Sequence, residues 1–387
     1  MSIVLFDNIY RKQLYPLSNT AAVADIRVGI CTGRQRWELL TKKRVYVHTE
    51  DYLSALYDAI PLNLHCWIDA SVLANNALAD RILSLNENEA IADSKGLIAG
   101  KKKISTTNFP KENLLASFET IHEYDDVLRI EYAWDIFQHN DKVLRSDYLL
   151  LTKDRRSQPL PTTFQFIGPE NIFIEEGATI SCAIINASTG PVYIGKNALI
   201  MEGALIRGPF AICNDAVVKM GAKIYGATTL GPCCVAGGEI KNAVMQGYSN
   251  KAHDGYLGDA VIGNWCNLGA GTTNSNVKNT GNMVKMWSAV MKDYIEVNIK
   301  CGVVMGDYTR TAINTSINTG SVIGTCCNIF GEGLSPKYIP DFQWGAKGIT
   351  RYELEKSLKD IDNWKKMKGQ FLSDIEKKIL QYIFETT

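Results

Sequence analysis

The sequence of 387 residues lacks any stretch near the roughly 18 consecutive apolar residues that a membrane-spanning helix needs. It also lacks a secretion signal, because no basic segment followed by an apolar stretch and a cleavage site precedes Asp7. Charge of one sign is not in excess either, since 41 Lys and Arg balance 41 Asp and Glu. We therefore expect a cytoplasmic protein with neither nucleic acid nor a membrane as a partner.

Paired cysteine motifs are missing as well. The ten cysteines are scattered, and none forms a CxxC pair or a Cys/His spacing typical of a metal site. We interpret them as small, buried thiols in a reducing compartment. Because the chain has no net charge, any anionic ligand must be held by a local cluster of basic side chains.

What the sequence does contain is a repeat of six residues. Such a period fits neither an amphipathic helix nor a two-sided strand, and it predicts a triangular coil of short strands, a parallel β-helix, over about 167–329. Each aliphatic residue then points to the axis, with a mostly small residue near each corner. The aliphatic positions are Ile194, Ile200, Ile206, Ile212, Val218, Ile224 and Leu230, and the corner positions are Ala198, Ala204, Phe210, Ala216, Ala222, Thr228 and Cys234.

The repeat extends in both directions and is broken once. It reaches back to Ile174 and Ile180 with a slip near 188–190, and it returns at Ile262, Leu268, Ile317, Ile323 and Ile329. The break lies between Ala236 and Ile262. Because repeats are usually interrupted where something else is built, we expect the functional site there.

The flanking regions predict two further domains. Strands are expected at 3–6, 44–47 and 66–69, and helices at 52–59 and 76–85, so residues 1–160 form an α/β domain that ends at a proline-punctuated linker. The coil domain then covers 161–335. Helical spacing from Tyr352 to Phe384 places a helical tail in 336–387, which we interpret as a cap or a packing arm.

The break holds His253, the one histidine of the coil region. A histidine titrates near neutrality, so it can accept a proton from an amine or hydroxyl that attacks a thioester. Lys241 offers a point charge for a phosphate. The glycine-rich run 269–272 lets a ligand approach the backbone without meeting a Cβ atom.

These residues resemble a known family. The stretch with Lys241, His253, Tyr256, 257–260 and 267–276 is similar to the acetyltransferase half of the bifunctional N-acetylglucosamine-1-phosphate uridylyltransferase/glucosamine-1-phosphate acetyltransferase family, which makes UDP-N-acetylglucosamine. The resemblance implies a left-handed β-helix, a homotrimer with active sites between subunits, and direct attack on acetyl-CoA without an acyl-enzyme. It implies an amino-sugar phosphate as the other substrate.

The resemblance also implies residue roles. His253 would deprotonate the sugar amine, Lys241 and Tyr256 would hold the sugar phosphate, and Asn267 and Asn276 would contact the sugar or the acetyl donor. The cofactor-binding run is Gly269, Ala270, Gly271 and Thr272. The family's lysine after this run and its arginine near the phosphate have no clear counterparts; Lys278 and Lys285 flank the first position, and Lys219 and Lys223 lie near the second.

The N-terminal region resembles sugar nucleotidyltransferases more distantly. The element Leu14-Tyr15-Pro16-Leu17-Ser18 looks like the segment after that family's phosphate loop, but the loop's glycines are missing. By this resemblance Arg11, Lys12 and Arg27 would face a nucleoside triphosphate, and Asp69 at a strand end would hold Mg²⁺. The alternative is a degenerate domain kept for packing or regulation.

The sequence therefore favours an acetyl-CoA-dependent N-acetyltransferase joined to a nucleotidyltransferase-like domain that makes a nucleotide sugar. The alternative is a sugar-1-phosphate nucleotidyltransferase whose β-helix mainly trimerises and regulates. A zinc enzyme on the same coil, like the trimeric carbonic anhydrases, needs three histidine ligands, and the coil offers only His253. A purely structural scaffold predicts that CoA does not protect the coil from heat.

Overall fold

The computed structural model describes residues 2–107, 109–161, 165–346 and 350–387. It contains two compact units. The head unit comprises Met1–Leu14, Thr20–Ile26 and Cys31–Tyr132, and the coil unit comprises Tyr15–Asn19, Arg27–Ile30 and Ala133–Thr387. The last helix before the coil, α3 (Asp135–Thr152), thus belongs to the coil unit.

The head unit is built on a six-stranded sheet with the order β2-β1-β3-β6-β5-β7. The inner strand β1 is parallel to both of its neighbours and buried on both sides, which explains its continuous apolar run. The sheet strands are β1 (Ser2–Phe6), β2 (Val45–His48), β3 (Leu64–Asp69), β5 (Glu89–Asp93), β6 (Gly96–Lys103) and β7 (Thr120–Glu123), and a separate pair joins β4 (Val72–Leu73) to β8 (Leu128–Arg129).

Two α-helices accompany this sheet, and local capping explains where they begin. The helix α1 (Gly33–Thr41) starts at a capping box between Thr32 and Gln35, and α2 (Asn76–Leu83) starts where the Asn75 side chain accepts the Leu78 N–H. The predicted strands and the helix at 76–85 are confirmed. The helix predicted at 52–59 is wrong, because this segment is a short 3₁₀ helix at Asp51–Leu56.

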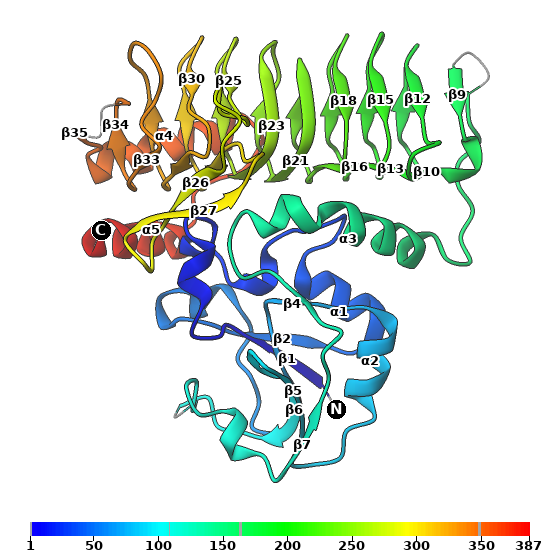
Figure 1. Ribbon diagram of the computed structural model, residues 1–387, viewed down its shortest axis with the longest axis vertical. Coiled ribbons are helices and arrows are strands. Elements are labelled where there is room, and N and C mark those ends of the chain that lie inside the picture. The colour runs from blue at the N-terminus through cyan, green and yellow to red at the C-terminus, as the bar shows by residue number, and fades with distance from the viewer. Residues whose placement is uncertain (1, 108, 162–164, 347–349) are drawn as a thin grey trace. The chain divides into compact units, whose positions relative to one another are not determined.

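The coil unit is the predicted parallel β-helix, and its strands stack into faces along the chain (Figure 1). The first face contains β9 (Gln165–Ile167), β12 (Ile184–Asn186), β15 (Leu205–Arg207), β18 (Lys223–Tyr225), β25 (Thr273–Asn274) and β30 (Ser316–Ile317). The second contains β10 (Ile172–Ile174), β13 (Val192–Ile194), β16 (Phe210–Ile212), β19 (Thr228–Leu230), β28 (Val304–Met305), β31 (Val322–Ile323) and β33 (Tyr338–Ile339). The third contains β11 (Thr179–Ile180), β14 (Leu199–Ile200), β17 (Val217–Val218), β20 (Val235–Ala236), β22 (Asn250–Lys251), β24 (Asn267–Leu268), β29 (Arg310–Thr311), β32 (Asn328–Ile329), β34 (Gln343–Trp344) and β35 (Thr350–Arg351).

The aliphatic positions of the repeat form the core of this coil. Ile194 pairs with Ile212, and Ile212 with Leu230, so that identical positions of successive coils lie on top of one another. All three side chains are fully buried, and each contributes roughly 1.5–3 kcal/mol on burial. The predicted fold class, an α/β domain followed by a β-helix and terminal helices, is confirmed.

The coil continues through the break in the repeat. Two longer strands, β21 (Glu239–Gly247) and β23 (Tyr256–Asn264), each run from the first face into the second and pair with each other along their length. Leu205 pairs with Lys223, Lys223 with Glu239, and Glu239 with Tyr256, so the coils here are shorter than those before. The six-residue spacing is lost because individual turns of the β-helix become shorter, while the β-helix itself continues.

A true insertion lies further on. The antiparallel hairpin of β26 (Val284–Ser288) and β27 (Asp293–Asn298) leaves the coil between β25 and β28. Buried side chains alternate with more exposed ones in β26, and half-buried side chains alternate with exposed ones in β27, as in a hairpin with one partly covered face. No hairpin was predicted in this region.

The helical tail is a packing arm on the third face. It consists of α4 (Leu354–Lys366) and α5 (Asp374–Thr386), and α5 begins at a capping box formed by Ser373 and Glu376. Lys368 between them donates from Nζ to the carbonyls of Cys233 at 2.7 Å and Tyr248 at 3.1 Å. The guanidinium of Arg310 lies 5.3 Å from the ring centre of Trp364, so cation–π contacts add to this attachment.

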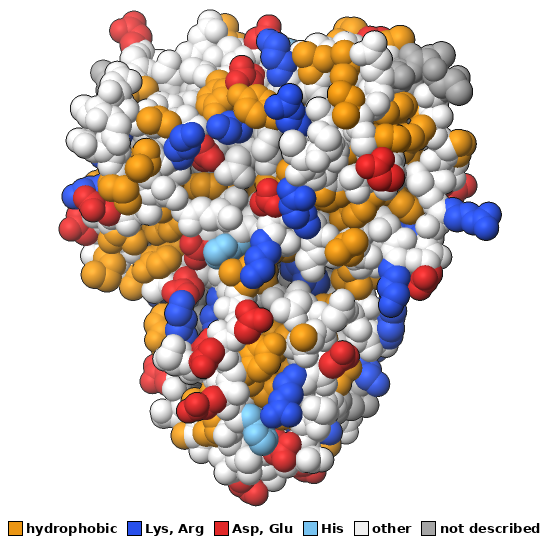
Figure 2. All heavy atoms as spheres, turned by 45° about the vertical axis from the view of Figure 1, so that its right-hand side comes forward, with side chains coloured by type: hydrophobic (Ala, Val, Ile, Leu, Met, Phe, Trp, Pro, Cys, Tyr) orange, Lys and Arg blue, Asp and Glu red, His pale blue; other side chains and the backbone are white. Residues whose placement is uncertain are grey.

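The surface agrees with the balanced composition. On the face drawn in Figure 2, basic and acidic side chains are intermingled with patches of hydrophobic ones, and neither sign dominates. Among the described residues, every helix is too short or too polar to span a bilayer.

Candidate active site of the coil and the hollow of the head

His253 lies on an exposed corner of the coil, between β22 on the third face and β23 on the first. The corner borders an open hollow. Asp254 accepts a hydrogen bond from the backbone N–H of Gly271 at 3.1 Å, which ties this corner to the next coil. The described residues that line the hollow with His253 are Lys219, Met220, Gly238, Ala252, Asp254, Ala270, Gly271, Ile313 and Asn314.

A buried lysine holds the histidine corner in place. Lys251 is 1% exposed, and its ammonium donates to the carbonyls of His253, Asp254 at 3.2 Å and Gly237 at 3.4 Å. Burial lowers the pKa of this ammonium from 10.5 to about 8, although Asp254 acts in the opposite direction. Lys251 therefore ties the backbone of His253 and Asp254 to that of Gly237.

We expect Lys251→Met to lower kcat of the reaction at His253 by about 10–100-fold, because small displacements of a catalytic group cost that much. Stability provides a second readout. The folded protein loses the Lys251 proton near pH 8 and the unfolded chain near 10.5, so stability rises with pH between these values. Urea unfolding at pH 7–10 should show this rise in the wild type and a smaller rise in the variant. An unchanged kcat would remove Lys251 from the site.

A cluster of polar side chains stands on the first face beside this corner. The Tyr256 hydroxyl accepts from Asn276 Nδ2 at 3.1 Å, and Asn276 also donates to Asp259 at 2.5 Å. Burial, together with the Asp259 carboxylate, raises the pKa of Tyr256 to about 12. The Lys241 ammonium lies 5.9 Å from the ring centre of Tyr225. The structure therefore brings the predicted residues Lys241, Tyr256 and Asn276 to one face.

Two carboxylates of this face had been given no role from the sequence. Asp259 accepts from Asn242 at 2.7 Å, and Glu239 accepts from the Tyr225 hydroxyl at 2.6 Å. The sequence does contain a signal for them, because each of the two long strands carries one acidic residue. A carboxylate that pointed into the apolar core of the coil would be costly to bury, so these side chains had to point outward.

Asn267 is placed differently from the other predicted residues. It lies on the third face, where its side-chain oxygen accepts from Asn250 at 3.3 Å, and Asn250 in turn accepts from Lys368 of the tail. Within one chain, a corner of the coil therefore separates Asn267 from Tyr256.

The glycine-rich run has a structural reason as well as a predicted functional one. A Cβ atom on Gly269 would stand 2.5 Å from the backbone of Ala312, and Gly271 has a φ of +75°. Thr272 is buried and bonded to Thr311 at 2.8 Å. Only Ala270 and Gly271 of this run line the hollow with His253.

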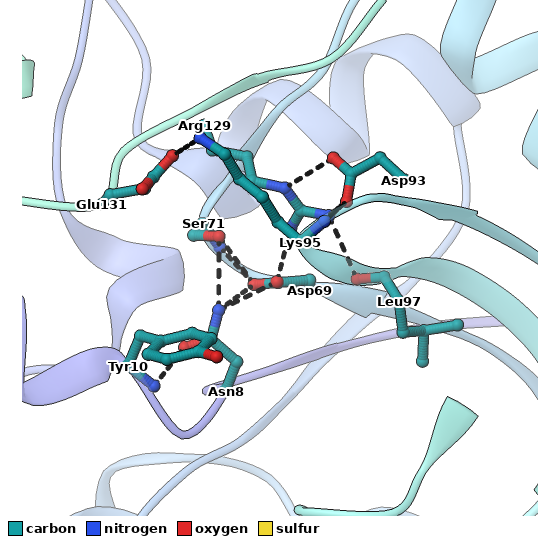
Figure 3. A network of polar contacts seen from close by, with 9 residues as sticks. All are labelled: Asn8, Tyr10, Asp69, Ser71, Asp93, Lys95, Leu97, Arg129 and Glu131. Carbon is teal, nitrogen blue, oxygen red and sulfur yellow. Dashed lines mark hydrogen bonds and ion pairs between the residues drawn. The ribbon is translucent and has the colours of Figure 1, made fainter. Parts of the chain in front are cut away.

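The head unit contains a second hollow of about 310 Å³. At its floor the Asp69 carboxylate accepts from Arg129 Nη1 at 2.6 Å, from Asn8 Nδ2 at 2.9 Å and from the Ser71 hydroxyl at 2.8 Å (Figure 3). Arg129 also donates to Asp93 at 3.1 Å and to the carbonyl of Leu97 at 3.3 Å. The described lining residues are Asn8, Tyr10, Arg11, Gln13, Leu14, Val23, Asp69, Ser71, Ser94, Lys95, Arg129, Ile130 and Glu131.

Three cationic residues were predicted to face a triphosphate, and the structure separates them. Arg11 lines the hollow, but it is buried and donates to Asp7 at 2.8 Å and to the Ala21 carbonyl at 3.1 Å. Lys12 is exposed and is not among the lining residues. Arg27 is buried in the coil unit, where it donates to the carbonyls of Ile30 and Gln246. This placement does not fit the role predicted for Arg27.

The predicted Mg²⁺ site at Asp69 does not fit either. Its carboxylate is already occupied by a guanidinium and by two further donors, and a divalent cation would stand against the charge of Arg129. The described part of the chain also holds no group of three or more His, Cys, Asp or Glu residues that could bind a metal ion.

Residues 3–156 match the family model for sugar nucleotidyl transferases. The bifunctional protein GlmU of Synechococcus elongatus is 26% identical over 274 residues, which are 64% of this chain and 55% of the relative. GlmU of Methanocaldococcus jannaschii is 31% identical over 120 residues, 31% of this chain and 27% of the relative.

Solved structures are similar only over part of the chain. They include the polySia-specific acetyltransferase NeuO, with a TM-score of 0.25, 12% identity and coverage of 50% of this chain and 88% of that one. The polysialic acid O-acetyltransferase OatWY has a TM-score of 0.18 and 16% identity, and covers 46% of this chain and 80% of its own.

The chain spans about half the length of the curated relatives that it matches. Its sequence similarity nevertheless reaches beyond the head into the coil, because 274 aligned residues exceed the region of the family model. The matched family model describes transferases, in agreement with the class of enzyme predicted from the sequence. Residues 3–156 are thus similar to sugar nucleotidyl transferases, and a larger part of the chain is similar in sequence to the bifunctional proteins GlmU.

Proposed function

We propose that the coil is an acetyl-CoA-dependent N-acetyltransferase for an amino-sugar phosphate. The observation that carries this proposal is the exposed His253 at a hollow beside the polar face of Lys241, Tyr256 and Asn276. The solvent-exposed imidazole of His253 supplies a base. The side chains of Lys241, Tyr256 and Asn276 supply the groups that hold a sugar phosphate.

The proposed reaction has one bond-forming step. The sugar amine attacks the thioester carbonyl while His253 takes a proton from the amine, so that a C–N bond forms. The C–S bond then breaks, and the CoA thiolate leaves and takes up a proton. Lys241 and Tyr256 hold the phosphate, Asn276 orients Tyr256 through its amide, and the backbone of Ala270 and Gly271 borders the thioester.

The assembly proposed for this activity is a homotrimer. Asn267 lies on a different face from Tyr256, so a neighbouring copy is the way to bring both to one substrate. The first face also carries a row of exposed apolar side chains, Ile184 and Leu205 with Ile167 beside them, which are 40%, 44% and 51% exposed. This row ends at Lys223, Glu239 and Tyr256, where the polar cluster begins. Such an apolar row favours contact with another copy.

The decisive assay follows CoA release. The full chain is mixed with acetyl-CoA and glucosamine-1-phosphate, and free thiol is measured. We expect turnover with this acceptor and none with N-acetylglucosamine-1-phosphate, because its nitrogen is already acylated. Thermal unfolding at increasing CoA concentration distinguishes this proposal from a purely structural coil, because only a coil that binds CoA is stabilised by it. No thiol release and no thermal shift with CoA would contradict the proposal.

A second candidate function is nucleotidyl transfer in the head. It is favoured by the family match of residues 3–156. Pyrophosphate release from each nucleoside triphosphate with a sugar-1-phosphate and Mg²⁺ tests it. Absence of release with every triphosphate would leave the coil as the catalytic part.

A further inference from the structure

The hollow of the head has a polar floor and an aromatic rim. Asn8, Asp69 and Ser71 share hydrogen bonds at the floor. Tyr10 is 50% exposed, and its backbone N–H donates to the Asn8 side chain at 2.8 Å, which places its ring beside that floor (Figure 3). An exposed aromatic ring next to fixed hydrogen-bonding groups is the usual recognition surface for a flat or hydroxylated ring.

The cations of this hollow are already matched by carboxylates. Arg11 pairs with Asp7 at 2.8 Å, Lys95 with Glu131, and Arg129 with both Asp69 and Asp93. A triphosphate brings several negative charges, and such groups are bound by cations in excess or by backbone N–H groups of a glycine-rich loop. The segment from β1 to Arg27 contains no glycine. The lining therefore offers little to a polyphosphate.

Arg129 occupies the place where a divalent cation would neutralise Asp69. Its side chain is 6% exposed, as is that of Asp69, and the N–O distance is 2.6 Å. Asn8 and Ser71 take up the remaining directions of the carboxylate. Because the charge of Asp69 is already compensated, binding at this floor needs no metal ion.

We infer that the hollow of the head binds an uncharged, hydroxyl-bearing ring, from a free sugar or a nucleoside, stacked against Tyr10 and without a divalent cation. The inference goes beyond the proposed acetyl transfer, which it neither uses nor requires. The donors of Asn8 and Ser71 are used on Asp69, but the Asn8 carbonyl oxygen and the Ser71 hydroxyl oxygen each have capacity to accept a further hydrogen bond from a ring hydroxyl, and Lys95 and Glu131 also line the hollow.

Calorimetric titration of the full chain tests this inference. The probes are N-acetylglucosamine, uridine, and UTP, each in EDTA and in Mg²⁺. We expect at least one of the two uncharged probes to bind with an affinity that changes less than about twofold between EDTA and Mg²⁺, where twofold is well under 1 kcal/mol. The probe that binds identifies the source of the ring. Binding of UTP alone, and only with Mg²⁺, would overturn the inference, as would binding of no probe.

Two variants locate the binding site. Tyr10→Ala removes the stacking ring and should weaken binding about tenfold, in the range measured for one stacked base. The control Leu62→Ala truncates a side chain that is 59% exposed and outside the lining, and it should leave affinity unchanged. If both variants bind the probe as tightly as the wild type does, the ligand binds outside this hollow and the inference is wrong.

Asp69→Asn separates the two roles of the carboxylate. If Arg129 replaces the metal, the variant weakens binding by the same factor in EDTA and in Mg²⁺. A loss confined to the Mg²⁺ samples would make Asp69 a metal ligand and overturn the inference. Arg129 keeps its pair with Asp93 in this variant, so the head retains a partner for its buried guanidinium.

Discussion

Replacing His253 by alanine is expected to lower kcat for CoA release by about 10²–10⁴-fold, the range for loss of a general base. His253 is exposed, so its removal leaves no cavity and should not alter the stability of the coil. The substituted chain should therefore keep the melting temperature and the oligomeric state of the wild type. Thiol release at saturating acetyl-CoA, followed against the concentration of the amino sugar phosphate, measures the effect.

His122→Ala is the matched control. This histidine belongs to the head, is about one-third exposed and lies 3.8 Å from Glu89, so the same chemical change is made away from the coil. It should leave kcat within about twofold, since surface substitutions away from a site have small effects. Full activity of the His253 variant, or an equal loss in both variants, would contradict the assignment of the base.

The sequence predicted the coil well because its cause is local and repeated. Ile194, Ile212 and Leu230 each need an apolar neighbour above and below, so the same residue type returns at each coil and the period is visible. The break was misread for the same reason. From Lys223 to Tyr256 the coils shorten, the period is lost, and only the pairing of long strands shows that the coil continues.

The partners of the site residues were harder to predict, because they come from distant parts of the chain. Lys251 is two residues from His253, yet its burial depends on the carbonyl of Gly237 in the preceding coil. Asp69 was predicted to be a metal ligand because it ends a strand. No residue near it in the sequence indicated that Arg129, sixty residues later, would pair with it. Charge pairing across a fold has no period, and sequence spacing alone does not reveal it.

That ion pair leads to the second large prediction. Arg129→Met should destabilise the head by about 3–5 kcal/mol, because removing one partner of a buried ion network leaves the other charges uncompensated. The charges left behind are Asp69 and Asp93, whose side chains are 6% and 10% exposed. Hydrogen exchange in β3 and β6 during urea unfolding reports on this unit separately from the coil.

Arg44→Met is the control, since it removes an arginine whose pair with Asp58 is 65% and 75% exposed. Such a surface pair contributes little to stability because solvent and salt screen it, so exchange in β3 should hardly change. A triple variant that also carries Asp69→Asn and Asp93→Asn removes the uncompensated charges and should recover most of the loss. If Arg129→Met destabilises no more than Arg44→Met, the network does not hold the floor of the hollow. If the triple variant is the least stable, Asp69 and Asp93 stabilise the head through their hydrogen bonds and not through their charge.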